Sequence, residues 1–495
     1  MSTFRRTLAL ILLAASMADA QPQPSIGEAR VVELANALRL GSRDSLEAFI
    51  RRRFIEQNVS AAEMTLFLNY YQGFFHLAKG AQISTSNVTP YSAAAYWYSP
   101  LQQEWYTTSQ MRVDSVAPHR ILGMPRISRM PAPANAPAPA RTAVSEQEQL
   151  QEIGAYLKRM SDADIFSGAV VIAREGKPVF AQAYGYADRE KKIPNTVETP
   201  FLLGSMNKLF TGLAIGQLVE RGKLSYDDPL AKFLPDFPDP ESAKKIQIKH
   251  LLSHTSGLVR EGSPIDSTSI DRPTTIKAMV AAFERKPLAF APGTKHQYSN
   301  MGFVLLGRVI EIVTGRDYYE YMQQNVFAPA GATSASFPLL PHDGVAVVPM
   351  AYPYEPAWDS EGRLQGRNQL GRHGRRGSSA GNGVASALDI IKLSNAMRDG
   401  RIVKPETFRL HSSAKPELTA TIYGYGIIAG PYLGRPFVGH NGRSWGQCSE
   451  FGELRDTPYT IVVLSNLKMD WCRPVTERIL RVLRPSEATA KPAQP

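Results

Sequence analysis

The placement of strand-forming segments within residues 144–485 restricts the possible folds of this chain more than any other feature. Such segments occur at both ends of the region, whereas the residues between about 205 and 315 have a mainly helical pattern. The predicted strands are Ala169–Arg174, Pro178–Tyr186, Pro436–His440, Gln447–Leu454 and Tyr459–Asn466, with a closing helix at Val475–Leu483. We therefore expect an α+β or α/β unit with one antiparallel sheet assembled from both ends of the region, flanked by helices and carrying an inserted helical subdomain.

A smaller unit precedes this region. Residues 25–128 combine two helical patterns with three strand-like segments, which predicts a small α+β domain. The predicted elements are a helix near residues 31–40, a helix at Ala61–Leu77, and strands at Ala93–Tyr98, Glu104–Val113 and Arg120–Ile127. Residues 129–143 hold prolines among alanines and predict an extended linker, and residues 486–495 predict a disordered tail.

The first 20 residues have the pattern of an export signal. Arg5 and Arg6 form a basic start, and Leu8–Ala15 is apolar but too short to span a bilayer. Ala18-Asp19-Ala20 fits a cleavage site after Ala20. The sequence has no later run of about 18 apolar residues, so we expect no transmembrane anchor. We therefore expect a periplasmic or secreted protein.

Composition and motif searches exclude several functional classes. The 495 residues are 43% hydrophobic and 20% charged, which is typical of a globular chain. Two cysteines and nine scattered histidines offer no metal-ligand spacing, and the sequence lacks a phosphate-binding loop and a dinucleotide fingerprint, so we expect no metal or cofactor. The net charge of +11 permits anionic partners, but no basic run interleaved with aromatic residues predicts nucleic-acid binding.

A Ser-x-x-Lys spacing at the start of a predicted helix is the first candidate for chemistry. The spacing occurs four times, beginning at Ser205, Ser242, Ser412 and Ser465, so alone it is a weak indicator. Ser205 precedes a long apolar helical segment, which places Lys208 on the same helix face near the positive helix end. A capping serine with a solvated lysine is the simpler interpretation. Two G-x-S-x-G segments, Gly377–Gly381 and Gly442–Gly446, lack the strand and helix that flank a nucleophile elbow.

Neighbouring motifs weaken the simpler interpretation. The segments Phe201–Lys208, Leu251–Leu258, Pro292–Asn300 and Gly439–Gly442 occur in the order found in the serine β-lactamase and penicillin-binding-protein superfamily. Over residues 150–485 the sequence resembles the β-lactamase-related serine hydrolases near class C β-lactamases, class VIII-type esterases and D-aminopeptidases. The resemblance implies a serine β-lactamase/transpeptidase-like fold. Residues 25–128 resemble, more weakly, the NTF2-like accessory domain that precedes some of these hydrolases.

The resemblance implies a role for each motif residue. Ser205 would attack an ester or amide carbonyl to form an acyl-enzyme, with Lys208 or Tyr298 as its base. A nearby ammonium favours a phenolate, and a desolvated lysine can be neutral, so both residues are candidates. Asn300 would orient Lys208 and the substrate. The backbone N–H groups of Ser205 and Arg443 would form the oxyanion hole.

The segment His440-Asn441-Gly442 departs from the Lys-Thr-Gly form of many β-lactamases. The resemblance implies that Asn441 and Gly442 contact substrate, and it gives His440 a catalytic-site position like that in aminopeptidase and esterase-like members. A strand-end histidine bonded to backbone is the alternative interpretation. Because histidine is mostly neutral at pH 7, His440 predicts weak β-lactamase activity, with β-lactam binding that improves as pH falls through about 6.5.

Two further pairs carry predictions of structure. His254 and Ser256, within Leu251–Leu258, are interpreted as turn residues that hydrogen-bond their own backbone. Cys448 and Cys472 flank the last predicted strand hairpin, and we expect them to form a disulfide after export.

The leading functional hypothesis is an exported, cofactor-free serine hydrolase that acts on a small-molecule or short-peptide acyl substrate. A D,D-carboxypeptidase, D-aminopeptidase or β-lactamase acting on cell-wall peptides or β-lactams is the alternative within enzymes. A non-catalytic binding or scaffold protein that kept the fold is the alternative from another class. The sequence leaves the oligomeric state open.

Overall fold

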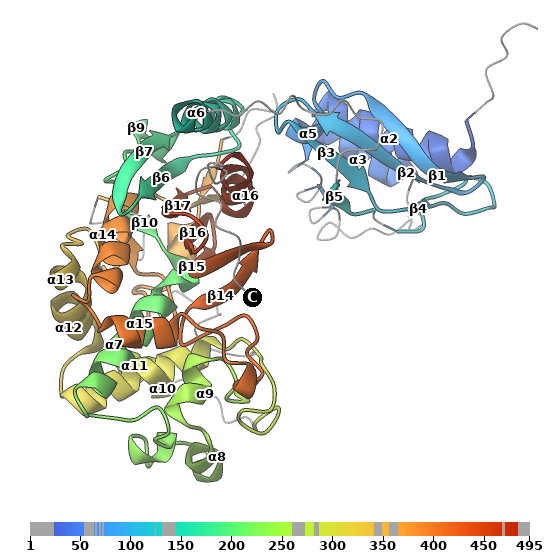
Figure 1. Cartoon of the computed structure of the whole chain (residues 1–495). Helices are drawn as coiled ribbons and strands as arrows, with labels where there is room; N and C mark the ends of the chain where they lie inside the picture. The colour runs from blue at the N-terminus through green and yellow to red at the C-terminus, as the bar shows by residue number, and fades with distance from the viewer. Residues whose placement is uncertain are drawn as a thin grey trace, which may run out of the picture. The chain divides into compact units, whose positions relative to one another are not determined.

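The computed structural model of the chain describes residues 24–53, 64, 67–68, 71, 74–123, 125–130, 145–259, 273–281, 287–340, 349–355, 365–467 and 471–483. The chain divides into two compact units, Met1–Thr142 and Ala143–Pro495 (Figure 1). The predicted leader and tail, linker residues 131–143 and most of the predicted helix Ala61–Leu77 lie outside the described residues.

The first unit is an antiparallel sheet packed against helix α2. Its elements are α2 (Ile26–Leu40), α3 (Arg43–Arg53), α5 (Phe75–Ala78), β1 (Ile83–Thr89), β2 (Ser92–Ser99), β3 (Glu104–Thr108), β4 (Met111–Arg112) and β5 (Ile127–Met130). The strand order is β1-β2-β3-β5, and β4 also pairs with β2. The predicted strand Glu104–Val113 is broken after Thr108, where the Ser109 N–H bonds Arg126 O at 2.6 Å. The last strand lies later than expected and extends the unit to Met130.

The second unit is built on a six-stranded antiparallel sheet with the order β14-β15-β16-β17-β6-β7. Its strands are β6 (Gly168–Arg174), β7 (Lys177–Tyr184), β14 (Ile428–Tyr432), β15 (Arg435–Ser444), β16 (Gln447–Leu454) and β17 (Tyr459–Ser465). The predicted sheet from both ends of the region is confirmed, because β17 pairs with β6 with Val462 opposite Val171. The edge strand β14 was not predicted, since Gly430-Pro431 interrupts any alternating apolar pattern.

Helices cover both faces of this sheet, which explains why β6 and β17 are nearly continuous apolar runs. Helices α6 (Glu146–Asp162) and α16 (Cys472–Val482) pack together on one face (Figure 1). Helix α14 (Ala387–Arg398) packs on the central strands β6 and β17. A capping box at Ser145 and Glu148 begins α6.

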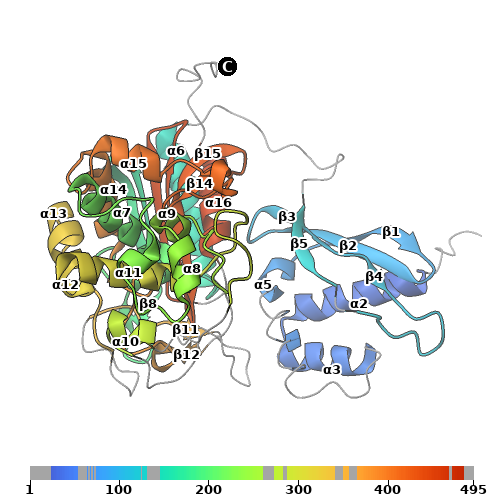
Figure 2. The same ribbon diagram turned by 90° about the horizontal axis from the view of Figure 1, so that it is seen from below.

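Helix α7 (Asn207–Glu220) is the centre of the helical part, and it is buried from Asn207 to Leu218. Helices α11 (Asn300–Thr314), α12 (Tyr318–Met322) and α15 (Pro405–His411) pack against it (Figure 2). The other helices are α8 (Pro240–Lys245), α9 (Ile248–Leu252), α10 (Ile276–Ala281) and α13 (Ala328–Ala330), with a π-helical turn at Gln323–Phe327. Three short strand pairs complete the unit: β8 (Tyr186–Asp188) with β9 (Ile193–Pro194), β10 (Phe201–Leu202) with β13 (Val384–Ala385), and β11 (Tyr354–Glu355) with β12 (Arg367–Asn368).

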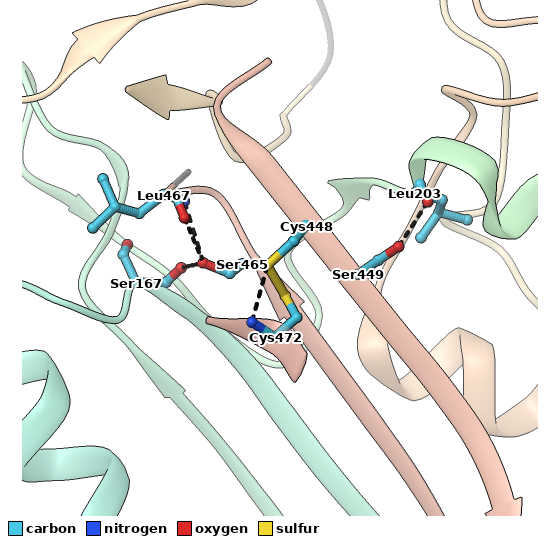
Figure 3. Close-up of a disulfide and its surroundings, with 7 residues drawn as sticks. All are labelled: Ser167, Leu203, Cys448, Ser449, Ser465, Leu467 and Cys472. Atoms are coloured by element: carbon cyan, nitrogen blue, oxygen red, sulfur yellow. Dashed lines mark hydrogen bonds between the residues drawn. A yellow bond between two sulfur atoms is a disulfide. The ribbon is translucent and has the colours of Figure 1, made fainter. Parts of the chain in front are cut away.

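A disulfide joins the sheet to the last helix. Cys448 in β16 and Cys472 at the start of α16 are bonded, with Cα atoms 5.9 Å apart (Figure 3). The next residue of β16, Ser449, donates a hydrogen bond from Oγ to Leu203 O at 2.7 Å. The strand that carries the disulfide is therefore also tied to the segment just ahead of Ser205.

We expect reduction of the Cys448–Cys472 disulfide to lower the free energy of unfolding by about 2–4 kcal/mol, because the bond closes a loop between residues 24 apart. Urea unfolding of oxidised protein and of protein held reduced measures the difference. The Cys448→Ala/Cys472→Ala variant is the matched control, since a reductant should leave its unfolding curve unchanged. Two thiols titrated in denatured, non-reduced protein would contradict the pairing.

Candidate active site

Ser205 lies in a short 3₁₀ turn, η1 (Gly204–Met206), that leads directly into α7. The sequence placed it in the first turn of the α-helix itself. The helix entry is held against residues near Gly383: the Leu203 N–H bonds Gly383 O at 2.8 Å, and Asn207 Oδ1 accepts the Gly383 N–H at 2.7 Å. Ser205 is half-buried, whereas the residues on both sides of it are buried. The turn therefore presents Ser205 as its accessible residue.

Lys208 is fully buried, at 0% exposure. Its Nζ donates to three oxygens: Ser205 Oγ at 3.1 Å, Asn300 Oδ1 at 2.7 Å and Ala380 O at 2.6 Å. A buried amine needs such partners because it has lost its water. The interpretation of Lys208 as a solvated lysine is therefore wrong.

The contacts of Lys208 accommodate both of its protonation states. Asn300 Oδ1 and Ala380 O are pure acceptors, so they take two N–H groups in either state. The third direction points to Ser205 Oγ. An ammonium places an N–H there, and a neutral amine places a lone pair that accepts the Ser205 hydroxyl proton. A proton can thus pass between Ser205 and Lys208 without rearrangement of the lysine.

Tyr298 and Asn300 reach the same place from the start of α11. Ser299 caps this helix, with its Oγ accepting the Gly302 N–H at 3.3 Å. The cap leaves Asn300 as the first helical residue, with its amide oxygen at Lys208. The Lys208 Nζ lies 4.8 Å from the centroid of the Tyr298 ring. The structure therefore brings Ser205, Lys208, Tyr298 and Asn300 together around one nitrogen atom.

The two backbone N–H groups of the predicted oxyanion hole, those of Ser205 and Arg443, lie at one contact between the η1 turn and β15. A Cβ atom on Gly204 would lie 2.7 Å from the Arg443 backbone nitrogen, and a Cβ on Gly442 would lie 2.8 Å from the Ser205 backbone nitrogen. Glycine at both positions therefore lets the η1 turn and β15 approach closely. The two backbone nitrogens that the sequence selected border this contact. The Arg443 side chain is exposed, so only its backbone is drawn into the contact.

One edge of β15 beside Ser205 lacks a strand partner in the described part of the chain. Strand β14 pairs with β15 only as far as Ile428 opposite Gly439, whereas β16 pairs with β15 along its length to Ser444. Among the described residues, no strand occupies the other edge of residues 440–444. An extended acyl group or peptide could therefore add to this edge as a further strand.

His440 is a buried, uncharged member of the site. It is 2% exposed, and its ring bonds Asn441 O through Nδ1 at 2.6 Å and the Tyr423 hydroxyl through Nε2 at 2.8 Å. A carbonyl only accepts, so Nδ1 carries the proton and Tyr423 donates to Nε2. Burial, and secondarily Lys208, lower the pKa of His440 to about 3. This low pKa removes the basis for the expectation that β-lactam binding improves as pH falls through about 6.5, because that expectation required His440 to protonate there.

Asn441 points away from the other predicted contacts, because successive side chains of a strand alternate between its faces. Its side chain bonds Glu450, a buried carboxyl whose pKa is raised to about 7 by burial. The Asn441 carbonyl is bonded to His440 Nδ1. The structure thus gives Asn441 partners within the protein, and Gly442 is the predicted substrate contact that borders Ser205.

Sequence reasoning missed three neighbours of the site. Tyr423 bonds His440, Ala380 supplies a carbonyl to Lys208, and the His254 ring lies against Tyr298. His254 was interpreted as bonding its own backbone, but its Nδ1 accepts the N–H of Ser299, 45 residues away. No local spacing connects such distant partners. The position of His254 inside the motif Leu251–Leu258 was the one signal in the sequence that pointed to a role near the site.

Two absences hold for the described part of the chain. There, no group of three or more His, Cys, Asp or Glu side chains could hold a metal ion. Nor does any helix described by the structure have the length and apolar character needed to cross a membrane.

A serine and a buried lysine lie at the start of a buried helix, beside an antiparallel sheet whose strands come from both ends of the second unit. This combination defines the class of penicillin-binding-like serine hydrolases. The beta-lactamase family profile matches residues 149–480, and the chain belongs to this family. The predicted fold class and the assignment to the serine hydrolases are thereby confirmed.

Relatives and solved structures agree with this assignment. The teichoic acid D-alanine hydrolase of Staphylococcus aureus is 29% identical over 332 residues, covering 66% of this chain and 75% of the relative. The penicillin binding protein from Bacillus halodurans is 28% identical, with a TM-score of 0.57 over 68% of this chain and 99% of that chain. The octameric penicillin-binding protein homologue from Pyrococcus abyssi is 28% identical, with a TM-score of 0.57 over 69% of this chain and 79% of that chain. The NTF2-like assignment of the first unit stays a prediction.

Proposed function

We propose that this protein is an exported serine hydrolase that cleaves an ester or amide bond through an acyl-enzyme on Ser205. The observation that carries the proposal is the position of the buried Lys208 Nζ, 3.1 Å from Ser205 Oγ and 2.7 Å from Asn300 Oδ1. A serine hydroxyl is a weak nucleophile at neutral pH unless a base takes its proton. Lys208 and Tyr298 are the groups in place to do so.

The reaction proceeds in two steps, acylation of Ser205 and hydrolysis of the acyl-enzyme. Ser205 Oγ attacks the carbonyl carbon while its proton passes to the Lys208/Tyr298 unit, and the carbonyl oxygen becomes an oxyanion next to the Ser205 and Arg443 N–H groups. The bond to the alcohol or amine breaks, and the leaving group takes the proton. Water then repeats the attack on the acyl-enzyme, which releases the acid and restores Ser205.

The proposed substrate is a small-molecule or short-peptide acyl donor outside the cytoplasm. The edge of β15 at residues 440–444, which no described strand pairs with, supports an extended acyl group. The predicted leader, residues 1–20, supports export, and the similarity to a teichoic acid D-alanine hydrolase supports a cell-envelope substrate. A D,D-carboxypeptidase, D-aminopeptidase or β-lactamase is the alternative that shares this mechanism, and a scaffold protein is the alternative that lacks it.

We expect p-nitrophenyl acetate and butyrate to be cleaved with higher kcat/KM than nitrocefin or benzylpenicillin. A lysine at position 440 would offer a β-lactam carboxylate a charge-assisted contact of about 1.5–3 kcal/mol, roughly ten- to a hundredfold in rate. The neutral His440 ring offers no such charge. Steady-state kinetics on the four substrates, with mass spectrometry of the trapped acyl-enzyme, measure the preference and its attachment to Ser205.

Two variants at the same position provide the comparison. His440→Lys should raise the ratio of nitrocefin to ester turnover about tenfold or more, while the uncharged His440→Gln should leave that ratio near the wild-type value. Nitrocefin turnover by the wild type that equals or exceeds its ester turnover would reverse the preference for esters. A wild-type protein that no acyl donor or fluorophosphonate labels at Ser205 would favour the scaffold alternative.

A further inference from the structure

A buried turn at residues 253–257 holds the segment that carries Tyr298. His254 is 1% exposed, and its φ of +59° lies in the left-handed region, which few residues with side chains adopt. Its carbonyl oxygen accepts the Gln297 N–H at 2.8 Å, and its Nδ1 accepts the Ser299 N–H at 3.1 Å. His254 therefore binds the chain on both sides of Tyr298.

The imidazole also contacts the Tyr298 ring directly. The two ring centroids are 4.2 Å apart with an interplanar angle of 33°. Tyr423 and Phe303 pack on the same imidazole, with centroids at 4.7 Å and 5.1 Å. The position of the Tyr298 ring beside Lys208 is thus set by a ring that is itself enclosed by aromatic side chains.

The His254 ring is neutral. Because Nδ1 accepts a backbone N–H, the ring proton is on Nε2, which has no hydrogen-bond partner in the described residues. Burial, then Lys208, lower the pKa of His254 well below its ordinary value. The titratable groups that face it are Lys208 from α7, His296 and Tyr298 ahead of α11, Tyr423 ahead of β14 and His440 from β15. A neutral ring here adds no positive charge beside Tyr298.

We propose that His254 is a positioning residue that fixes the Tyr298 ring beside Lys208. The inference rests on the proposed role of the Lys208/Tyr298 unit in activating Ser205. His254 touches no reacting atom; it positions Tyr298 through the ring contact, while the two hydrogen bonds that flank Tyr298 hold the backbone of the segment. A displacement of a catalytic group by about 1 Å is enough to lower a rate about a hundredfold.

Three substitutions separate positioning from mere stability. His254→Asn keeps an acceptor where Nδ1 stands and tolerates a positive φ, but removes the ring. His254→Phe keeps a ring and removes the acceptor. His250→Asn is the matched control, because the buried His250 in α9 also accepts a backbone N–H on Nδ1 at 3.1 Å, from Gln247, and has no ring contact with Tyr298 among those described.

The measurements are the pH profile of kcat/KM for p-nitrophenyl acetate, the Tm, and fluorophosphonate labelling of Ser205. For His254→Asn we expect about a ten- to hundredfold lower kcat/KM and an acid limb moved to higher pH, because a Tyr298 displaced from Lys208 loses stabilisation of its phenolate. His254→Phe should lower Tm, since the buried Ser299 N–H loses its acceptor, while its acid limb stays at the wild-type pH. His250→Asn should lower Tm through the loss of its buried ring and keep the wild-type limb.

A folded His254→Asn protein with the wild-type acid limb, or an equal movement of the limb in His250→Asn, would overturn the inference. If His254→Asn does not fold, His254→Phe decides, because a moved limb with the ring retained contradicts positioning through the ring. Wild-type protein that is not labelled at Ser205 would instead overturn the proposed function, and this inference with it.

Discussion

Replacing Ser205 with alanine is expected to lower kcat/KM for every substrate of this protein by at least roughly a thousandfold, because the acyl-enzyme can no longer form. Fold and stability should change little, since Ser205 is half-buried in a 3₁₀ turn whose neighbours form the packing. Steady-state kinetics and far-UV circular dichroism measure the two effects. The labelled peptide seen with fluorophosphonate in the wild type should be absent from the variant.

A second Ser-x-x-Lys pair provides the control. Ser412 follows α15 and stands three residues before Lys415, but its Oγ contacts Arg409 O rather than a lysine. Ser412→Ala should therefore keep wild-type turnover. Retention of more than about a tenth of the activity in Ser205→Ala would exclude Ser205 as the nucleophile.

Lys208→Met and Tyr298→Phe are each expected to remove most of the activity, and the double variant should be little worse than either one. Groups that handle one proton as a unit lose their effect together, so their losses do not multiply. For Lys208 the expected loss follows from its Nζ, which contacts Ser205, Asn300 and Ala380 at once. The double-mutant cycle in kcat/KM measures the coupling between Lys208 and Tyr298.

The same chemical change at another buried lysine separates catalysis from stability. Lys415 is 4% exposed and donates from Nζ to Leu410 O at 2.8 Å and Ser413 O at 2.9 Å. Lys415→Met should lower Tm, because these carbonyls lose their partner, and should leave kcat/KM unchanged. Losses of Lys208→Met and Tyr298→Phe that multiply in the double variant would show that the two residues act independently.

The elements that the sequence predicted are those marked by local pattern. The apolar runs of β6 and β17 are long because both sheet faces are covered, and these strands and β16 were found with nearly their observed bounds. Ser205 and Lys208 were selected by their spacing before an apolar helix together with the resemblance of the neighbouring motifs to the β-lactamase-related hydrolases. Strand β14 was missed because Gly430-Pro431 leaves it without such a pattern.

The parts that could not be predicted depend on contacts between distant residues. Ala380 O binds Lys208 across 172 residues, and Ser299 N binds His254 across 45. The burial that keeps His440 neutral comes from a sheet and helices that assemble only in the folded protein. Local patterns and the family resemblance report motifs along the chain, so they selected the residues of the site without their protonation states.

The pairing of β17 with β6 has a consequence for the order of events during synthesis. Ser465 Oγ bonds Ser167 O across 298 residues, and β15, which brings Gly442 and Arg443 to Ser205, also comes late in the chain. Contacts of such high contact order form slowly, and they cannot form before the last strands have left the ribosome. A nascent or truncated chain that stops before β15 therefore has the serine and the lysine but no complete site. Hydrolytic activity therefore reports that β15 has been made and has reached the Ser205 turn.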